Sequence, residues 1–166
     1  MSRKIQVAGI VDDSIVDGVG LRLTVFTQGC SRRCPGCHNP QTPELDGGKT
    51  MDVDEILDLV KKNPLLDGIT LSGGEPFLQV RACTELAKGV HDMGLNVWCY
   101  TGYVFEDLLS NNEYLREFLE SIDVLVDGPF KQNKKTLNSR FRGSTNQRII
   151  DVPASLREGR TILIED

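Results

Sequence analysis

The sequence predicts an α/β fold in which parallel strands alternate with helices. Short runs rich in Val, Ile and Leu alternate with segments whose apolar residues recur at helical spacing. Glycine, proline and polar residues follow several of the predicted strands, as is typical of the carboxyl ends of parallel strands. The length of 166 residues is that of one domain, so we expect a single domain over residues 1–166.

The first two elements are predicted to be strands at residues 5–10 and 21–27. The second strand has a two-residue period, in which one set of side chains alternates with another: Leu21, Leu23 and Val25 against Arg22, Thr24 and Phe26. Asp52 is expected to begin a helix, with Glu55 as its capping-box partner.

The rest of the chain continues the alternation. Strands are predicted at residues 68–71, 95–101 and 123–126, and helices at 77–93 and 105–121, the second with a break near 110–112. The tail is expected to contain a strand at 147–151, a turn of helix after Pro153 and a last strand at 161–164. These βαβ units predict a partial α/β barrel, with the exits of the strands at 21–27, 68–71, 95–101 and 123–126 at one mouth.

The composition excludes several classes of protein. Lys and Arg number 19 and Asp and Glu 24, giving a net charge of −5, which argues against a dedicated nucleic-acid binder. No apolar run is long enough for a membrane span. The first residues show no apolar signal region, so we expect a cytoplasmic protein.

A cysteine loop is the most informative segment. Cys30, Cys34 and Cys37 have the spacing Cys-x3-Cys-x2-Cys in a loop that also contains proline and glycine, and soft thiolates select zinc, copper(I) or iron–sulfur centres. A structural zinc ion requires a fourth ligand, for which His38 is the only nearby candidate. An iron–sulfur cluster held by three cysteines leaves one iron open to a substrate or cofactor. The spacing therefore favours iron–sulfur, and a non-catalytic, zinc-stabilised adaptor is the alternative.

Two further motifs follow predicted strands. In Ser72-Gly73-Gly74-Glu75, the glycines permit a close approach of a ligand to the backbone, and Glu75 offers a carboxylate for a cationic group. A plain strand-to-helix turn, with Glu75 at the helix N-terminus, is the alternative. Asp127 is a weaker candidate for the same site, because an Asp-Gly-Pro turn explains it nearly as well. Cys83 and Cys99 are expected in the core.

The segment 131–148 is strongly basic. Residues 131–150 contain no Asp or Glu, and their cations are Lys131, Lys134, Lys135, Arg140, Arg142 and Arg148. A solvated loop is one interpretation. The others are docking to a partner or contact with the anionic end of a cofactor; nucleic acid is less favoured because few aromatic residues are interleaved.

Several motifs together resemble a known family. The segment 17–22 (Asp-Gly-Val-Gly-Leu-Arg), the cysteine loop and Asn39-Pro40 are similar to the signature of glycyl-radical-enzyme activases in the radical S-adenosylmethionine superfamily. The segments 72–76, 126–130 and 140–148 resemble those of the activating proteins of anaerobic (class III) ribonucleoside-triphosphate reductases. These motifs cover most of the chain. Gly36 is a departure, since an aromatic residue often precedes the third cysteine in this superfamily.

The resemblance implies an oxidoreductase with an open, partial βα barrel of the radical S-adenosylmethionine type. It implies that Cys30, Cys34 and Cys37 bind three irons of a [4Fe–4S] cluster and that S-adenosylmethionine binds the fourth. In such enzymes the reduced cluster cleaves S-adenosylmethionine to a 5′-deoxyadenosyl radical, which removes hydrogen from a glycine of the partner. The expected cofactor contacts are Gly36, Cys37, His38, Gly73, Gly74, Glu75 and Asp127.

The implied partner is the large subunit of the anaerobic reductase, together with an external one-electron donor such as flavodoxin. Neither nucleic acid nor a membrane is expected as a partner. The nearest alternatives are activation of another glycyl-radical enzyme, such as pyruvate formate-lyase, and radical chemistry on a small molecule.

Overall fold

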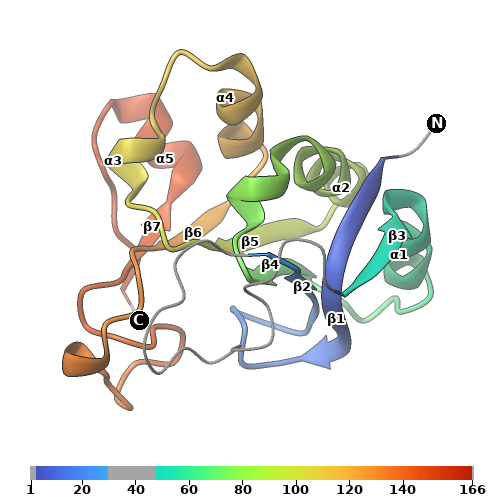
Figure 1. The fold of residues 1–166 in the computed structure, drawn as a ribbon, viewed down its shortest axis with the longest axis horizontal. Helices are drawn as coiled ribbons and strands as arrows, with labels where there is room; N and C mark the ends of the chain where they lie inside the picture. Colours follow the sequence, from blue (N-terminus) through green and yellow to red (C-terminus); the bar gives the residue numbers. More distant parts are fainter. Residues whose placement is uncertain (1–2, 30–47, 166) are drawn as a thin grey trace.

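The computed structural model describes residues 3–29 and 48–165 (Figure 1). The strands are β1 (Lys4–Ser14), β2 (Arg22–Thr27), β3 (Lys49–Asp52), β4 (Gly68–Gly73), β5 (Asn96–Tyr100), β6 (Val124–Asp127) and β7 (Arg148–Asp151). The helices are α1 (Val53–Lys61), α2 (Val80–Asp92), α3 (Phe105–Leu108), α4 (Glu113–Glu120) and α5 (Val152–Glu158), with 3-10 helices η1 (Pro76–Gln79) and η2 (Gln132–Lys134). Across these described ranges, no helix has both the length and the apolar character that a membrane span needs.

The strands form one seven-stranded sheet in the order β3-β1-β2-β4-β5-β6-β7. Strands β2, β4, β5 and β6 run parallel, as predicted, whereas β1 and β7 are antiparallel to their neighbours β2 and β6. The edge strand β3, which the sequence did not predict, pairs with β1. Within the described residues the sheet is open, so the observed architecture is a mixed α/β fold.

The predicted helices are present with adjusted boundaries. The helix predicted at 77–93 consists of η1 followed by α2, and Pro76 occupies the first turn of η1, where its missing N–H costs nothing. The helix predicted at 105–121 is interrupted as expected, and Asn112 caps α4 by accepting a hydrogen bond from the Leu115 N–H at 3.1 Å. The strand predicted at 161–164 is wrong in extent, because only an isolated bridge joins Leu163 to Ile150.

The two faces of the sheet carry different side chains. Leu23 and Val25 of β2 belong to the main hydrophobic core, which also contains buried residues of α1, α2 and α4. In Figure 1, α2, α3, α4 and α5 lie above the sheet and the orange segment 128–147 lies below it. A second cluster on that lower side contains Trp98, Val126, Phe141 and Ile149. Segment 128–147 therefore covers part of the face away from the helices.

Hydrogen bonds from Arg22 link the amino-terminal ends of the parallel strands. Its guanidinium is fully buried and donates to Thr70 Oγ1 at 2.8 Å, to the Ile69 carbonyl at 2.6 Å and to Asn96 Oδ1 at 2.7 Å. It also lies 5.7 Å from the centroid of the Trp98 ring. Burial lowers the pKa of Arg22 to about 10, so the side chain remains charged at neutral pH. The carboxyl ends of the same strands, at Thr27 and Gly73, lie at the opposite edge of the sheet.

Candidate functional site

The carboxyl ends of β2, β4, β5 and β6 lie side by side at one edge of the sheet (Figure 1). Thr27 at the end of β2 pairs with Gly73 at the end of β4. Beyond the strands, the Gly74 N–H donates to the Thr27 carbonyl at 2.9 Å, and the Thr101 N–H donates to the Val126 carbonyl at 3.0 Å. The predicted convergence of these strand exits is therefore confirmed.

Gly73 and Gly74 pack against the backbone that leads into the cysteine loop. Gly73 has a φ of +100°, and a Cβ atom built on it would lie 2.5 Å from the Thr27 nitrogen. A Cβ atom on Gly74 would lie 2.3 Å from the Gly29 carbonyl oxygen. The sequence predicted a close approach at these glycines, and the structure places the chain's own residues 27–29 there.

The carboxylate of Glu75 is buried among hydrogen-bond donors. Its exposed fraction is 2%, and it accepts hydrogen bonds from the Thr101 hydroxyl at 2.7 Å and the Gly102 N–H at 2.7 Å. It also accepts from the Phe77 N–H at 3.1 Å, which makes it the N-cap of η1. Glu75 is thus a cap at a helix N-terminus, as the alternative interpretation of the sequence proposed, and its carboxylate lies at the strand exits.

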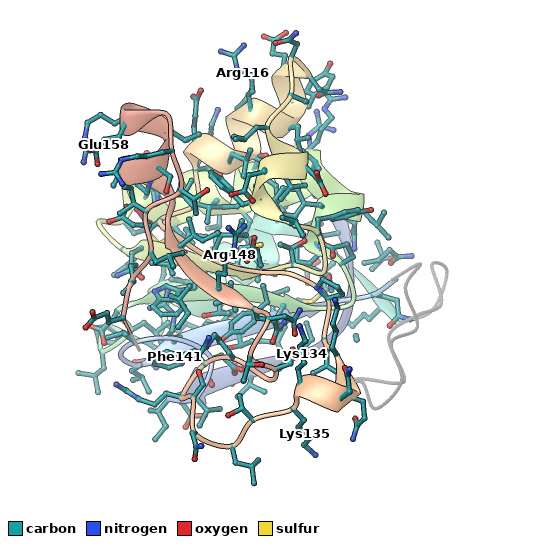
Figure 2. The ribbon with its side chains drawn as sticks, turned by 90° about the vertical axis from the view of Figure 1, so that its left-hand side faces the viewer. Arg116, Lys134, Lys135, Phe141, Arg148 and Glu158 are labelled. Carbon is teal, nitrogen blue, oxygen red and sulfur yellow. The ribbon has the colours of Figure 1, made fainter. Side chains whose placement is uncertain are left out.

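The carboxylate of Asp127 is bound by Arg148. Asp127 is 1% exposed and accepts from Arg148 Nε at 3.1 Å, from Arg148 Nη2 at 2.5 Å and from the Phe105 N–H at 2.8 Å. Arg148 also donates to both carboxylate oxygens of Glu106, at 2.6 and 3.1 Å. Arg148, which is labelled in Figure 2, is partly exposed. Arg148 therefore neutralises charge from two carboxylates at this edge.

The pKa values around Arg148 reflect this sharing. Hydrogen bonds from Arg148, and then from the Thr161 hydroxyl, lower the pKa of Glu106 to about 2. The hydrogen bonds to Asp127 and Glu106 raise the pKa of Arg148 above its usual value. The guanidinium and the Glu106 carboxylate are consequently both charged at neutral pH.

Gln79 is a positioning residue that the sequence did not reveal. Its side chain accepts a hydrogen bond from the Gln6 N–H at 2.8 Å and donates to the Gln6 carbonyl at 2.9 Å. It also donates to the Gln28 carbonyl at 3.2 Å. Hydrogen bonds from this amide thus link both β1 and Gln28, which precedes Gly29, to the start of α2. A single glutamine early in a helix gives no sequence signal for such a role.

The side chain of Asn146 lies close to the end of β6. Its amide nitrogen donates to the Pro129 carbonyl at 2.8 Å, close to the end of β6. Its Oδ1 atom is buried and has no hydrogen-bond partner within residues 3–29 and 48–165. Because an unsatisfied buried acceptor costs free energy, this atom is suited to receive a donor from a bound molecule.

The other predicted site residues, Gly36, His38 and the three cysteines of the cysteine loop, lie outside the described residues. Within residues 3–29 and 48–165, no group of three or more His, Cys, Asp or Glu side chains is arranged to hold a metal ion. Cys83 and Cys99 are buried in the main core, as predicted. Burial raises the pKa of Cys83 to about 12 and that of Cys99 well above its usual value, so both thiols are neutral.

Comparisons with known proteins identify relatives of this chain. A family model described as a 4Fe-4S single cluster domain matches residues 16–150. The chain is similar to the anaerobic ribonucleoside-triphosphate reductase-activating protein of Salmonella typhimurium, with 38% identity over 141 residues, covering 80% of this chain and 90% of that protein. The protein of that name from Escherichia coli K12 is 37% identical over 142 residues, with the same coverage. That of Enterobacteria phage T4 is 31% identical over 141 residues, covering 81% of this chain and 86% of the phage protein.

Proposed function

Because the chain belongs to the family of anaerobic ribonucleoside-triphosphate reductase-activating proteins, we propose that it activates such a reductase by generating a glycyl radical on it. The reaction uses a [4Fe–4S] cluster and S-adenosylmethionine, with an external one-electron donor. The fold that this function requires is a partial βα barrel, whose parallel core would be β2, β4, β5 and β6.

One observation carries the proposal most directly. The Glu75 N–H donates to the Gly29 carbonyl at 2.7 Å, and Gly29 immediately precedes Cys30. The cysteine loop and the Gly73-Gly74-Glu75 segment therefore begin at the same point of the sheet edge. In this proposal Cys30, Cys34 and Cys37 are the cluster ligands, and the donor set of three thiolates fits an iron–sulfur cluster with one open iron.

The described residues at this edge fit a bound S-adenosylmethionine. Glu75 presents a carboxylate held in place by Thr101 and Gly102, as an ammonium partner should be. Asn146 Oδ1 is a buried acceptor without a partner in the part of the chain that the structure describes. Asp127 and Arg148 form a fixed charged pair beside the exit of β6. Gly36, Cys37 and His38 complete the proposed contacts from the cysteine loop.

In this proposal each of these residues binds a cofactor or fixes the orientation of another side chain. The cluster, when bound, supplies the electron for reductive cleavage of S-adenosylmethionine, which leads to removal of a hydrogen atom from a glycine of the reductase. Glu75 would hold the amino group of the methionyl part, and Arg148 keeps the Asp127 carboxylate in one orientation. The protein contributes position and exclusion of water, because the chemistry belongs to the cofactors.

Anaerobic reconstitution with iron and sulfide tests the proposal. The brown protein should absorb near ~400 nm and, with reductant and S-adenosylmethionine, should produce the electron paramagnetic resonance signal of a glycyl radical on the reductase. Alanine variants of Cys30, Cys34 or Cys37 should lose both properties, whereas Cys83→Ala and Cys99→Ala should keep them. A colourless zinc protein, or a radical formed only on a different glycyl-radical enzyme, would overturn the proposal.

A further inference from the structure

Segment 128–147 begins and ends beside the candidate site. Asp127, the last residue of β6, pairs with Arg148, the first residue of β7, so both ends of the segment lie at the carboxyl edge of the parallel strands. Figure 1 shows the segment, in orange, on the side of the sheet away from the helices. The two ends of the segment are therefore anchored next to the site.

The segment is an ordered platform. The Oγ of Ser144, a fully buried residue, accepts a hydrogen bond from the Lys131 N–H at 3.3 Å, and Ser144 forms a β-bridge with Lys135. The ring of Phe141 packs edge-on against Trp98, with 5.1 Å between ring centroids. Further backbone hydrogen bonds join the two arms of the segment, from Thr136 to Gly143 and from Thr145 to Lys134. The shape of the surface is therefore set before a partner arrives, which reduces the entropy cost of binding.

Among the described residues, the lysines of this platform have no carboxylate partner, unlike Lys4 and Lys88. Lys4 pairs with Asp52 at 2.7 Å and Lys88 pairs with Glu117 at 2.5 Å. Lys131, Lys134 and Lys135 are exposed and form no ion pair with any described residue. In Figure 2, Lys134 and Lys135 lie at the lower end of the molecule and Arg116 lies at the opposite end.

An apolar side chain accompanies these charges. Leu137, two residues after Lys135, is 90% exposed. An exposed leucine adds nothing to the binding of phosphate groups, but it contributes apolar area to a contact between proteins. The chain as a whole has a net charge of −5, so this local positive surface is not a consequence of its composition. Together these features fit an acidic protein surface with an apolar recess.

We infer that Lys131, Lys134, Lys135 and Leu137 form the docking surface for an acidic region of the reductase, next to the glycine that receives the radical. The inference rests on the proposed function, since it names how the partner of that same site is recognised. The lysines accelerate the encounter and set its dependence on salt, and Leu137 adds contact area once the two proteins have met.

The test compares two adjacent lysine pairs. Lys134→Glu with Lys135→Glu reverses the charge of the docking surface. Lys61→Glu with Lys62→Glu makes the same change of charge at the end of α1, where both residues are exposed. Helix α1 and the orange segment 128–147 lie on opposite sides of Figure 1. Association of each reconstituted protein with the reductase is measured at low and at high salt. We expect the first variant to associate roughly tenfold more slowly at low salt, with a smaller difference at high salt, and the control to match the unchanged protein.

Two further measurements separate this inference from the proposed function. Cleavage of S-adenosylmethionine without the reductase should be unchanged in the Lys134/Lys135 variant; equal losses of cleavage and association would mean that the segment serves the site or the fold. Unchanged association at every salt concentration would overturn the docking surface, even if the unchanged protein activates the reductase. Tight binding of duplex DNA that depends on the same lysines would assign the surface to nucleic acid instead. Failure of the unchanged protein to activate the reductase would overturn the proposed function itself.

Discussion

The backbone N–H of Glu75 donates to the carbonyl oxygen of Gly29 at 2.7 Å. Gly29 directly precedes Cys30, and Glu75 carries the buried carboxylate of the candidate site. This hydrogen bond joins the segment proposed to hold the cluster to the segment proposed to hold S-adenosylmethionine. A substitution in one segment should therefore also alter binding at the other segment.

Gly74→Ala should reduce the iron content of the reconstituted protein as well as its affinity for S-adenosylmethionine. A Cβ atom at residue 74 would lie 2.3 Å from the Gly29 oxygen, so the backbone entering the cysteine loop must move. Overpacking of this kind costs about 1–3 kcal/mol. Iron and sulfide per chain after reconstitution, and the dissociation constant for S-adenosylmethionine, are the measurements. From the sequence alone the two segments belong to separate loops, and iron content would be expected to remain unchanged.

Gly9→Ala is the control for this variant. Gly9 lies in β1, and a Cβ atom on it would meet no atom within 4 Å. This variant should keep its iron and its cofactor affinity. Full iron content in Gly74→Ala would contradict the coupling of the two segments.

Thr101→Val should weaken the binding of S-adenosylmethionine by roughly tenfold, because the buried carboxylate loses a hydrogen-bond donor and is less well positioned. The loss of such a hydrogen bond to a buried group costs about 1–3 kcal/mol. The hydroxyl of Thr101 donates to Glu75 at 2.7 Å, and Glu75 is 2% exposed. Valine keeps the shape of the side chain and removes only the hydroxyl. Titration calorimetry of the reconstituted protein measures the affinity.

Thr84→Val provides the comparison, since Thr84 and Thr101 are both 5% exposed. The hydroxyl of Thr84 donates to the Val80 carbonyl within α2, at 2.7 Å. Its loss should leave the affinity for S-adenosylmethionine unchanged. If both variants bind equally well, Thr101 does not position Glu75 for the cofactor.

The order of the strand exits could be predicted from the sequence because it follows from local periodicity. The alternation in β2 correctly separates Leu23 and Val25 from Arg22. The alternation did not predict that Arg22 is fully buried, because Asn96 and Trp98, which contact it, lie more than seventy residues away in the chain. Strand β3 has the sequence Lys-Thr-Met-Asp, which has no strand pattern, and it forms because β1 offers it an edge.

The site shows the same division between local and distant information. The sequence identified Glu75 and Asp127 by their positions after strands. Their partners Thr101 and Arg148 follow 26 and 21 residues later, and no local pattern links the members of each pair. The sequence did not indicate which cation of the basic segment binds Asp127. The pairing of β6 with β7 places Arg148 beside it. Contacts across a sheet edge depend on register, which single-sequence periodicity does not determine.

Glu106 and Asp127 share one guanidinium, and this arrangement predicts a dependence of stability on pH. Arg148 Nη2 lies 2.6 Å from Glu106 Oε1 and 2.5 Å from Asp127 Oδ2. The pKa of Glu106 is lowered to about 2 from its usual 4.5. Because the folded-state pKa is the lower one, the ionised carboxylate stabilises the fold above pH 4.5, and this contribution is lost as the pH falls from 4.5 toward 2.

Glu106→Gln should therefore lower the free energy of unfolding at pH 7 by about 0.5–1 kcal/mol, a small effect because water screens this half-exposed ion pair. The difference from the unchanged protein should stay constant down to about pH 5 and shrink below it, as the carboxylate begins to take up a proton. Urea unfolding of both proteins, in the same cluster state and at a series of pH values, measures the difference. Glu158→Gln is the control, because Glu158 lies 3.9 Å from Arg160 on the surface of α5 (Figure 2). This variant should change the free energy of unfolding by no more than a few tenths of the change expected for Glu106→Gln. A difference for Glu106→Gln that stays constant down to pH 3 would show that the charge of Glu106 does not contribute through Arg148.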